Sequence, residues 1–422
     1  MNKIKIGLIG LGTVASGVYK TLQSFDNIEI VKIAVRDINK DRNIEGLDKS
    51  ILTLDANEIV NDESIQIVVE LIGGVEPAMT LIKTAINNGK HVVTANKELL
   101  AKHGEELFKF AEEHNKVVLY EAAIAGGIPL IMPIKTILAG NKINKIKAIL
   151  NGTTNYILTK MDVQNASYSD VLKEAQELGY AEADPTGDVE GFDAAYKITT
   201  LATIAFGKRI KIDNVYREGI TKISPDDMKA ANELGYKIKL IASAELNKDG
   251  RADVRVHPML VPQSKTLAHI DYVTNAVSLS GHPVGDVTLS GPGAGEFPTA
   301  SSVVGDILAI ASEIGKTDYL LPMMRCHHHE NAQMMNISET ENKYYISITA
   351  QNSMGVIGRI GKACEDNNIS LASIVQKEVA GDNAAKITVI TELCKEKDMQ
   401  KVIEIFNNDS ATNVDSLIRV QI

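Results

Sequence analysis

Short apolar strands alternate with amphipathic helices through the first part of the chain. Residues 3–9 predict a buried strand, which runs into a glycine turn and a helix over residues 14–25. The alternation continues, with further strands expected at 28–35, 65–71, 90–94 and 117–121 and helices at 76–88 and 98–114. Strands joined by helices form right-handed crossovers and a parallel sheet. We therefore expect residues 1–130 to form a doubly wound α/β domain.

The pattern changes after about residue 130. A strand is expected at 143–150, helices at 168–178, 192–206 and 299–314, extended segments at 252–260 and 270–280, and a glycine-rich turn at 291–295. This mixture favours an α+β domain over residues 131–325. The polar residues 326–342 are expected to form a linker. Their three consecutive histidines, His327 to His329, point in different directions and suit a solvated linker better than a metal site.

The last part of the chain, residues 343–422, has an order of elements of its own. Strands are expected at 344–349, 370–378, 386–393 and 414–422, and helices at 355–367 and 397–407. The order βαββαβ is the ferredoxin-like topology. We therefore expect a separate C-terminal module.

Composition and charge limit the partners of the chain. With 422 residues it is too long for one core, so two or three domains are expected. A net charge of -10 argues against nucleic acid or an anionic membrane as a partner. No apolar stretch reaches the ~20 residues of a membrane helix. The three cysteines, Cys326, Cys364 and Cys394, are odd in number and far apart, which indicates a reducing, cytoplasmic environment.

The turn after the first strand matches the dinucleotide fingerprint G-x-G-x-x-G/A, with Ala15 in the third position. Gly10 allows the tight turn, and Gly12 lets the backbone approach a pyrophosphate. The helix that begins near Thr13 and Val14 offers unpaired N–H groups and a positive dipole end to the phosphates. The pattern predicts a Rossmann dinucleotide-binding domain; the alternative is a glycine-rich turn of any other α/β protein.

The end of the second strand bears on the choice of cofactor. An acidic residue there binds the ribose hydroxyls of NAD, whereas an arginine suits the 2′-phosphate of NADP. Arg36 comes first, with Lys40 and Arg42 close behind. This favours NADP, and the neighbouring Asp37 leaves NAD open.

Four later segments combine small, polar and charged residues beside apolar strands. They are HVVTANK at 91–97, YEAAIAGGIP at 120–129, NGTTNY at 151–156 and AEADPTGDVEGFDAAYK at 181–197. Together with the glycine turn they resemble the homoserine dehydrogenase family, and the last segment is similar to that family's signature. The resemblance implies an NAD(P)-dependent oxidoreductase that acts on a CH–OH group. Its reaction would interconvert L-aspartate 4-semialdehyde and L-homoserine in threonine and methionine biosynthesis.

The residues themselves suit such a reaction. Hydride addition to an aldehyde leaves negative charge on the carbonyl oxygen, so the site needs a positioned cation or acid. Lys97 follows the fourth strand, at the edge where doubly wound sheets bind ligands. Asp193 and Lys197 are four residues apart on an expected helix, so they share one face. The alternative is an ordinary surface ion pair.

The resemblance assigns roles to these side chains. It implies that Lys197 is the proton donor, that Asp193 orients it, and that Lys97 contacts both cofactor and substrate. Glu182 and Asp188 would bind the substrate.

Further residues follow from the same resemblance. Thr94, at the end of the fourth predicted strand, would contact the cofactor. Gly295 would do so as well, because residues 291–315 are expected to fold back onto the dinucleotide domain; the alternative for Gly295 is a simple turn. A monovalent cation such as sodium would be held by the Glu121 carboxylate and by three carbonyl oxygens, those of Ile124, Gly126 and Ile128. The alternative there is a glycine-rich turn with a solvated glutamate.

The C-terminal module resembles an ACT domain, which implies allosteric regulation by an amino acid such as threonine. Gly355 opens its first helix, where N–H groups are available to a carboxylate. The ACT family often has Asp-x-Pro-Gly at this turn, whereas residues 352–355 are Asn-Ser-Met-Gly, which removes a charged partner for an effector. The alternative is a module that only pairs subunits. A homodimer or homotetramer is expected in either case.

Two rival functions stay open on the sequence. One is a related amino-acid dehydrogenase that acts on another small substrate. The other is a non-catalytic amino-acid sensor, against which the presence of Lys97 and Lys197 argues.

Overall fold

A computed structural model describes residues 3–315, 324–326, 328, 330–378 and 384–421. The chain forms two compact units, each built from three segments. Unit 1 contains Met1–Leu150, Asp193–Val215 and Thr274–Ala332, and unit 2 contains Asn151–Phe192, Tyr216–Val273 and Gln333–Ile422. Two of the three consecutive histidines, His327 and His329, lie outside the described residues.

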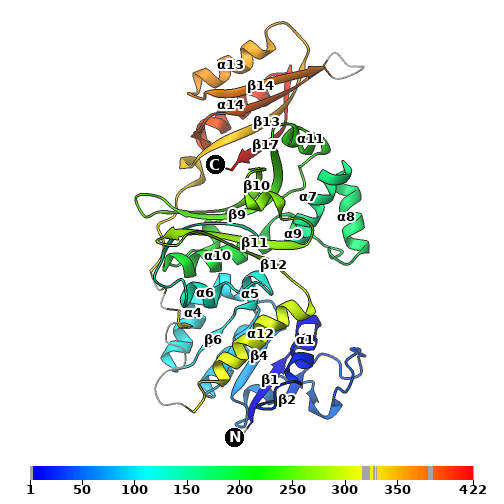
Figure 1. Cartoon of the computed structure of the whole chain (residues 1–422), viewed down its shortest axis with the longest axis vertical. Helices are drawn as coiled ribbons and strands as arrows, with labels where there is room; N and C mark the ends of the chain where they lie inside the picture. Colours follow the sequence, from blue (N-terminus) through cyan, green and yellow to red (C-terminus); the bar gives the residue numbers. More distant parts are fainter. Residues whose placement is uncertain (1–2, 316–323, 327, 329, 379–383, 422) are drawn as a thin grey trace. The chain divides into compact units, whose positions relative to one another are not determined.

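Unit 1 contains the predicted parallel sheet, with strand order β3-β2-β1-β4-β5-β6 (Figure 1). Its strands are β1 (Ile4–Ile9), β2 (Ile28–Ala34), β3 (Leu52–Thr53), β4 (Ile67–Glu70), β5 (His91–Thr94) and β6 (Val118–Leu119). The strands β4 and β5 are buried along their whole length, as expected for a sheet covered on both faces. The strand order reverses between β1 and β4, and such a switch point leaves a crevice for a ligand at the carboxyl ends of the strands. The predicted doubly wound fold is confirmed.

Helices α1 (Thr13–Leu22), α2 (Asn57–Val60), α3 (Ala78–Asn87) and α4 (Lys97–Glu113) connect these strands. A fifth helix, α12 (Glu296–Ala311), comes from much later in the sequence and lies beside α1 (Figure 1). A Cβ atom on Gly17 would lie 2.6 Å from the Glu296 carbonyl oxygen, so the close approach of the two helices requires glycine. Lys20 Nζ forms an ion pair with Glu296 at 2.7 Å. The late helix is therefore packed against the first helix of the sheet.

The rest of unit 1 comes from residues that follow β6 in the sequence. Two short helices, α5 (Ala122–Ala125) and α6 (Ile131–Lys135), follow β6. The strands β7 (Lys142–Ile149), β11 (Thr274–His282) and β12 (Gly285–Pro292) pair in the antiparallel order β7-β11-β12. The helix α10 (Phe192–Phe206) is apolar on most of its surface and is buried accordingly.

Unit 2 begins with the helices α7 (Gly152–Gln164), α8 (Tyr168–Glu177), α9 (Thr186–Val189) and α11 (Pro225–Glu233). The antiparallel strands β9 (Tyr236–Leu246) and β10 (Ala252–Pro262) follow, and the short strand β8 (Tyr216–Arg217) pairs with β10. The sequence pattern did not predict α7, α11, β9 or β12. Helix α7 buries residues all around its surface, so it has no clear polar face to reveal its period.

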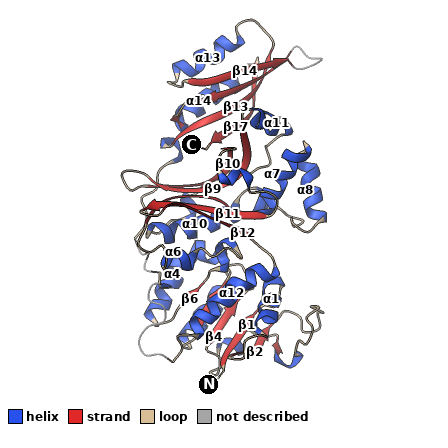
Figure 2. Ribbon diagram, in the orientation of Figure 1, coloured by secondary structure: helices blue, strands red, loops and turns tan. Residues whose placement is uncertain are grey.

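The C-terminal module has the predicted order of elements. They are β13 (Glu341–Gln351), α13 (Val356–Asp366), β14 (Leu371–Glu378), β15 (Ala384–Thr391), α14 (Glu396–Asn408) and β17 (Thr412–Val420), with the short strand β16 (Cys394–Lys395) before α14. Alternate residues of β13, such as Tyr344, Ile346 and Ile348, pack with Ile360 of α13 and Val402 of α14. Both helices therefore share one apolar core with the sheet (Figure 2). The ferredoxin-like topology is confirmed.

The last strand of this module also extends the sheet of unit 2. The strand order there is β9-β10-β17-β13-β15-β14. The pairing of β10 with β17 is parallel and joins Met259 to Arg419 and Leu260 to Val420. The module is thus hydrogen-bonded to β10 through its own backbone.

The expected linker carries backbone hydrogen bonds where it is described. The Glu330 carbonyl oxygen accepts from the Arg209 N–H at 2.7 Å in unit 1, and the Gln333 carbonyl oxygen accepts from the Ala252 N–H at 2.7 Å in unit 2. Such bonding explains why this polar segment follows a defined path. No helix in the described ranges combines the length and the apolar character needed to cross a membrane.

Candidate active site

The glycine turn after β1 has the geometry that its sequence suggested. Gly10 has a φ of +101°, and a Cβ atom on it would lie 2.9 Å from the Ile72 side chain and 3.1 Å from the Leu71 carbonyl oxygen. A side chain at this position would be strained and would collide with the neighbouring strand end. Gly12 is the N-cap of α1 and is exposed, so the first N–H groups of the helix, those of Thr13 and Val14, face outward from the turn.

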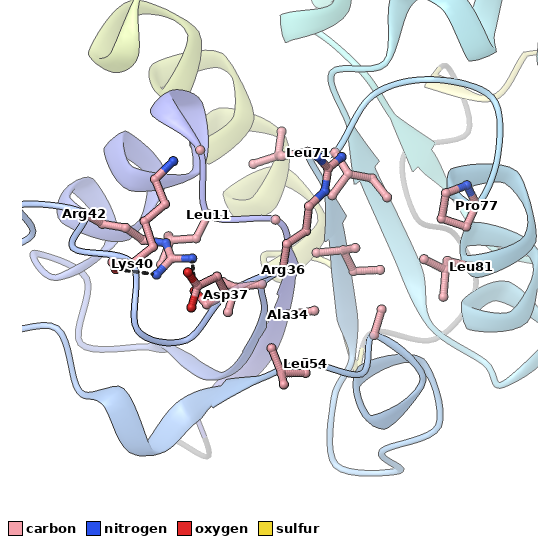
Figure 3. A pocket seen from close by; sticks show the side chains of 16 residues that line it. Leu11, Ala34, Arg36, Asp37, Lys40, Arg42, Leu54, Leu71, Pro77 and Leu81 are labelled. Atoms are coloured by element: carbon pink, nitrogen blue, oxygen red, sulfur yellow. Dashed lines mark hydrogen bonds between the residues drawn. The ribbon is translucent and has the colours of Figure 1, made fainter.

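A cavity of about 500 Å³ opens beside this turn, between the ends of the central parallel strands. Apolar side chains line one part of it, namely Leu54, Leu71, Pro77 and Leu81. Arg36, Asp37, Lys40 and Arg42 line another part, and Figure 3 shows Lys40 and Arg42 on the side away from Pro77 and Leu81. The cavity combines an apolar part with a cationic part, which suits an adenine ring and a phosphate group.

The cationic part is held in shape by its own hydrogen bonds. The Arg42 guanidinium donates to the Asp37 carbonyl oxygen at 2.6 Å and to the Lys40 carbonyl oxygen at 2.8 Å (Figure 3). The Asp37 carboxylate accepts from the N–H of Asn39 at 2.8 Å, so it stabilises its own turn. The exposed Arg36 precedes this turn and reaches the same cavity.

A buried glutamate that the sequence analysis did not select shapes the neighbouring strand ends. Glu70 has no exposed surface, and its Oε1 accepts from the N–H groups of Ile72 (2.8 Å) and Gly73 (3.0 Å). Its Oε2 accepts from the Thr94 hydroxyl at 2.6 Å. Thr94 thus contributes to the site by fixing Glu70 and the loop after β4. An acidic residue at the end of the buried strand Ile67–Glu70 was the signal for this role.

Three charged side chains of unit 1 meet beyond the carboxyl end of β5. Lys97 is the first residue of α4, and Asn96 caps that helix by accepting from the Leu99 N–H at 3.1 Å. The Lys97 ammonium forms an ion pair with Oδ1 of Asp193. The Oδ2 atom of Asp193 accepts from Lys197 Nζ at 2.7 Å. The structure therefore brings together the three residues predicted to be catalytic.

The three residues differ in their burial. The side chains of Asp193 and Lys197 are 6% and 11% exposed, whereas the Lys97 side chain is 44% exposed. Lys197 Nζ also donates to the Leu150 carbonyl oxygen at 2.8 Å, at the end of the β7 region. Asp193 and Lys197 are thus buried, and the interpretation as an ordinary surface pair is wrong.

The charge of Asp193 is stabilised by its neighbours. Burial raises the pKa of this carboxyl group, but the ammonium groups of Lys197 and Lys97 outweigh burial and hold the pKa well below its usual value. Asp193 therefore stays a carboxylate at neutral pH. One carboxylate between two ammonium groups leaves the cluster with a formal net positive charge, which would stabilise an alkoxide-like oxygen.

Glu121 lies directly after β6 with its carboxylate turned inward, and it is 6% exposed. Its oxygens accept from three successive backbone N–H groups at the start of α6, those of Leu130, Ile131 and Met132. Glu121 therefore caps this short helix, whose first N–H groups have no partner within the helix. The alternative of a solvated glutamate is wrong.

The turn after Glu121 packs backbone against backbone with the segment before α12. A Cβ atom on Gly126 would lie 2.4 Å from the Gly293 carbonyl oxygen, and the φ of Gly126 is +58°. The Gly126 carbonyl oxygen accepts from the Ser302 hydroxyl at 2.6 Å. Ile124 and Ile128 are buried on either side of Gly126. Gly295, with a φ of +117°, is the N-cap of α12.

Two of the predicted substrate ligands, Glu182 and Asp188, belong to unit 2. Glu182 is exposed in the loop between α8 and α9, and Asp188 lies in α9. The Asp188 carboxylate accepts from Asn151 Nδ2 at 2.7 Å, which connects this short helix to the start of α7.

A parallel sheet with a glycine cradle and a nearby lysine–carboxylate cluster is typical of one class of enzyme, the nicotinamide-dependent dehydrogenases. Comparison with known families gives three matches. The NAD-binding domain of homoserine dehydrogenase matches residues 10–121, homoserine dehydrogenase matches 129–308, and the ACT domain matches 344–410. The chain belongs to the homoserine dehydrogenase family and carries an ACT domain.

Individual relatives match this chain over three quarters or more of its length. Homoserine dehydrogenase from Synechocystis is 42% identical over 431 residues, which covers 99% of each chain, and that from Bacillus subtilis is 36% identical over 100% of this chain and 99% of its own. The crystal structure of a homoserine dehydrogenase from Thiobacillus denitrificans has a TM-score of 0.93 at 38% identity and covers 100% of this chain and 99% of its own. A hyperthermophilic archaeal homoserine dehydrogenase in complex with NADPH has a TM-score of 0.64 at 26% identity, over 75% of this chain and 100% of that one. The chain is an NAD(P)-dependent oxidoreductase that acts on a CH–OH group, and the predicted family resemblance is confirmed.

Proposed function

We propose that this chain interconverts L-aspartate 4-semialdehyde and L-homoserine, with Lys197 as the proton donor to the substrate oxygen. The observation that carries the assignment is the buried Asp193 carboxylate, which holds the ammonium groups of both Lys97 and Lys197. A cluster of this kind has the positive charge that a developing alkoxide requires. A non-catalytic sensor would have no need to bury it.

In aldehyde reduction, a bound nicotinamide supplies the hydride to the carbonyl carbon. Lys197 then transfers a proton from Nζ to the carbonyl oxygen, and Asp193 keeps that ammonium group in place. The accepting carbonyl of Leu150 fixes Lys197 from another direction. Lys97, the most exposed member of the cluster, contacts substrate and cofactor. Glu182 and Asp188 bind the substrate from the loop and the short helix before α10, where Glu182 pairs with the substrate ammonium.

We propose NADP as the preferred cofactor. Gly10, Gly12, Thr13 and Val14 hold its pyrophosphate, and Thr94, Lys97 and Gly295 complete the site. Arg36 supports the preference for NADP, because it reaches the cavity at the end of β2 while the Asp37 carboxylate is engaged with its own turn. The NADPH complex of the archaeal relative agrees with this choice.

We also propose a monovalent cation such as sodium at the turn after Glu121, with the carbonyl oxygens of Ile124, Gly126 and Ile128. The donors are hard oxygens, as an alkali cation prefers. The three N–H groups that reach Glu121 hold its carboxylate in place, and the Ser302 hydroxyl fixes the Gly126 carbonyl group.

The regulatory and domain-level proposals follow from the family matches. We propose threonine as the effector of the ACT domain, a homodimer or homotetramer as the assembly, and the cytoplasm as the location. We place the domain limits at 1–130, 131–325 and 343–422. The first and third contain the matched ranges 10–121 and 344–410, and the second contains all of the matched range 129–308 except its first two residues.

The test is a steady-state assay of the whole chain with L-homoserine and either NADP or NAD, followed by the appearance of reduced nicotinamide. We expect turnover with L-homoserine, none with other small amino alcohols, and a higher kcat/KM with NADP. An Arg36→Ala variant is expected to lose roughly tenfold in kcat/KM for NADP and to change little for NAD, because a charged hydrogen bond to the 2′-phosphate is removed. An equal loss for both cofactors would contradict the role of Arg36, and absence of turnover would contradict the function.

A further inference from the structure

Arg419, near the end of the last strand of the ACT module, is buried against carboxylates from two other segments of unit 2. It is 2% exposed. Its guanidinium donates to both carboxylate oxygens of Glu396, at 2.7 and 3.0 Å, and Glu396 is the first residue of α14 in the same module. A further nitrogen, Nη1, donates to Glu218 Oε2 at 2.9 Å, and Glu218 lies outside the module, directly after β8.

Glu218 belongs to the segment 217–220, which is packed against residues 189–192. These residues end the stretch 178–192, here called the substrate loop, which carries the proposed substrate ligands Glu182 and Asp188. The Arg217 guanidinium donates to the Glu190 carbonyl oxygen at 2.5 Å and lies 3.3 Å from the centre of the Phe192 ring. The Ile220 N–H donates to the Val189 carbonyl oxygen at 2.9 Å.

This contact involves the backbones of both segments. A Cβ atom on Gly219 would lie 2.4 Å from the Val189 carbonyl oxygen and 2.8 Å from Glu190 Cα. The two backbones are in direct contact at Gly219, so a displacement of the segment after β8 would shift residues 189–192. The next residue in the sequence after Phe192 is Asp193.

We infer that Glu218 is a positioning residue through which Arg419 of the ACT module holds the Val189–Phe192 end of the substrate loop. The inference rests on the proposed function for the roles of Glu182 and Asp188 in that loop. It adds a structural route between the regulatory module and the substrate site. The route consists of the ion pair between Arg419 and Glu218 and of the contacts of residues 217–220 with residues 189–192, all within unit 2.

Charge and burial make this connection specific. One guanidinium serves two carboxylates, and its pairing with Glu396 is bidentate and almost fully buried, with 3% and 4% of the two side chains exposed. Glu218 is 35% exposed, so it is removable without leaving a buried charge unpaired, because Arg419 keeps Glu396. Arg419→Lys is not a conservative change here, because one ammonium group cannot replace the three guanidinium nitrogens that donate to Glu396 and Glu218.

The experiment compares Glu218→Ala with a matched control, Tyr345→Phe. The Tyr345 hydroxyl also connects the ACT module to the rest of unit 2, through Asp227 of α11 at 3.2 Å, but it does not reach residues 189–192. We expect Glu218→Ala to raise KM for L-homoserine by roughly 2- to 30-fold, with kcat and the KM for NADP within about twofold. The control is expected to leave all three constants unchanged.

Hydrogen–deuterium exchange of the whole chain gives a readout that does not depend on turnover. We expect faster exchange at residues 186–192 in Glu218→Ala and Arg419→Lys, and no change there in Tyr345→Phe. The double variant is expected to resemble the more affected single variant, because both changes remove the same contact. Additive effects, or unchanged exchange in Glu218→Ala, would overturn the inference. If L-homoserine is not a substrate the proposed function fails, and the exchange result still decides the role of Glu218.

Discussion

Two buried charge clusters in this chain are built alike and serve different ends. In unit 1 the Asp193 carboxylate forms ion pairs with two ammonium groups, those of Lys97 and Lys197, and the Lys97 side chain is 44% exposed. In unit 2 the Arg419 guanidinium forms ion pairs with two carboxylates, those of Glu396 and Glu218. The side chain of its bidentate partner Glu396 is as buried as that of Arg419. The first cluster is partly open to solvent, whereas the second is closed around its centre.

We propose that the first cluster serves chemistry and that the second serves architecture. Desolvating charges is costly, so a buried cluster persists only where every member is paired. In the first cluster two ammonium groups share one carboxylate, and the Lys97 side chain is partly exposed. In the second cluster, the ion pairs of Arg419 with Glu396 and Glu218 join the ACT module to the segment after β8. Four experiments sharpen this comparison.

The largest expected effect is on turnover at the open cluster. Replacing Lys197 with alanine removes the proposed proton donor, and we expect kcat for L-homoserine oxidation to fall by roughly 10²- to 10⁴-fold. The thermal unfolding midpoint of the variant, measured beside the wild type, separates this loss from misfolding. Nearly full kcat in a folded Lys197→Ala protein would show that the proton comes from elsewhere.

The closed cluster is expected to affect stability most. Replacing Arg419 with methionine leaves Glu396 and Glu218 without their cation, and we expect a loss of about 3–5 kcal/mol in the free energy of unfolding. Urea denaturation measures this loss. As a control, Lys362→Ala removes an exposed ion pair with Asp366 in the same module and is expected to change stability very little. Similar losses in the two variants would contradict the distinction between buried and exposed pairs.

Lys97 tests the open side of the first cluster. Because it is proposed to contact substrate and cofactor, Lys97→Met is expected to raise both KM values by roughly tenfold, with a smaller change in stability than Arg419→Met. Lys83→Met is the matched control. Lys83, on α3, pairs with Glu106, which lies on α4 as Lys97 does but nine residues further along the chain. A stability loss in Lys97→Met as large as in Arg419→Met would mean that both clusters are architectural.

The smallest expected effect concerns pH. The folded-state pKa of Asp193 lies well below its usual value of 3.8, because the two ammonium groups outweigh burial. Its charge therefore stabilises the fold above the unfolded pKa of about 3.8, and this contribution is lost as the pH falls further, through the lower folded-state pKa. The difference in unfolding free energy between wild type and Asp193→Asn should be constant near neutral pH and shrink only in strong acid. A difference that declines near neutral pH would argue against a lowered pKa.

The contrast also shows what the sequence is able to predict. The glycine turn at Gly10 and Gly12 is local, so strand, turn and helix follow from neighbouring residues. Asp193 and Lys197 are four residues apart, and the family resemblance joined them to Lys97. Arg419 and Glu218 are about two hundred residues apart in sequence. Neither belongs to a motif, and an isolated charged residue looks the same in a sequence whether it is solvated or buried.

The missed elements have related causes. The residues of β9 follow α11 with only a short turn between them, and α7 lacks the clear amphipathic period on which helix prediction depends. Glu70 lies in the predicted strand 65–71, but its hydrogen bonds to the next loop depend on how that loop turns. Burial and backbone partners of this kind are properties of the assembled fold and not of the local pattern.

The packing of α12 on α1 has a consequence for how such a chain is inherited. Its cofactor-binding unit is assembled from distant stretches of sequence, and Gly17 receives the backbone of α12 at a distance that admits no side chain. Recombination that exchanged only the first stretch would leave the outer face of α1 uncovered and Lys20 without Glu296. Exchange of the cofactor cradle between relatives should therefore succeed only when the late helix travels with it. In this chain the dinucleotide fold is therefore not a part that is separable from α12.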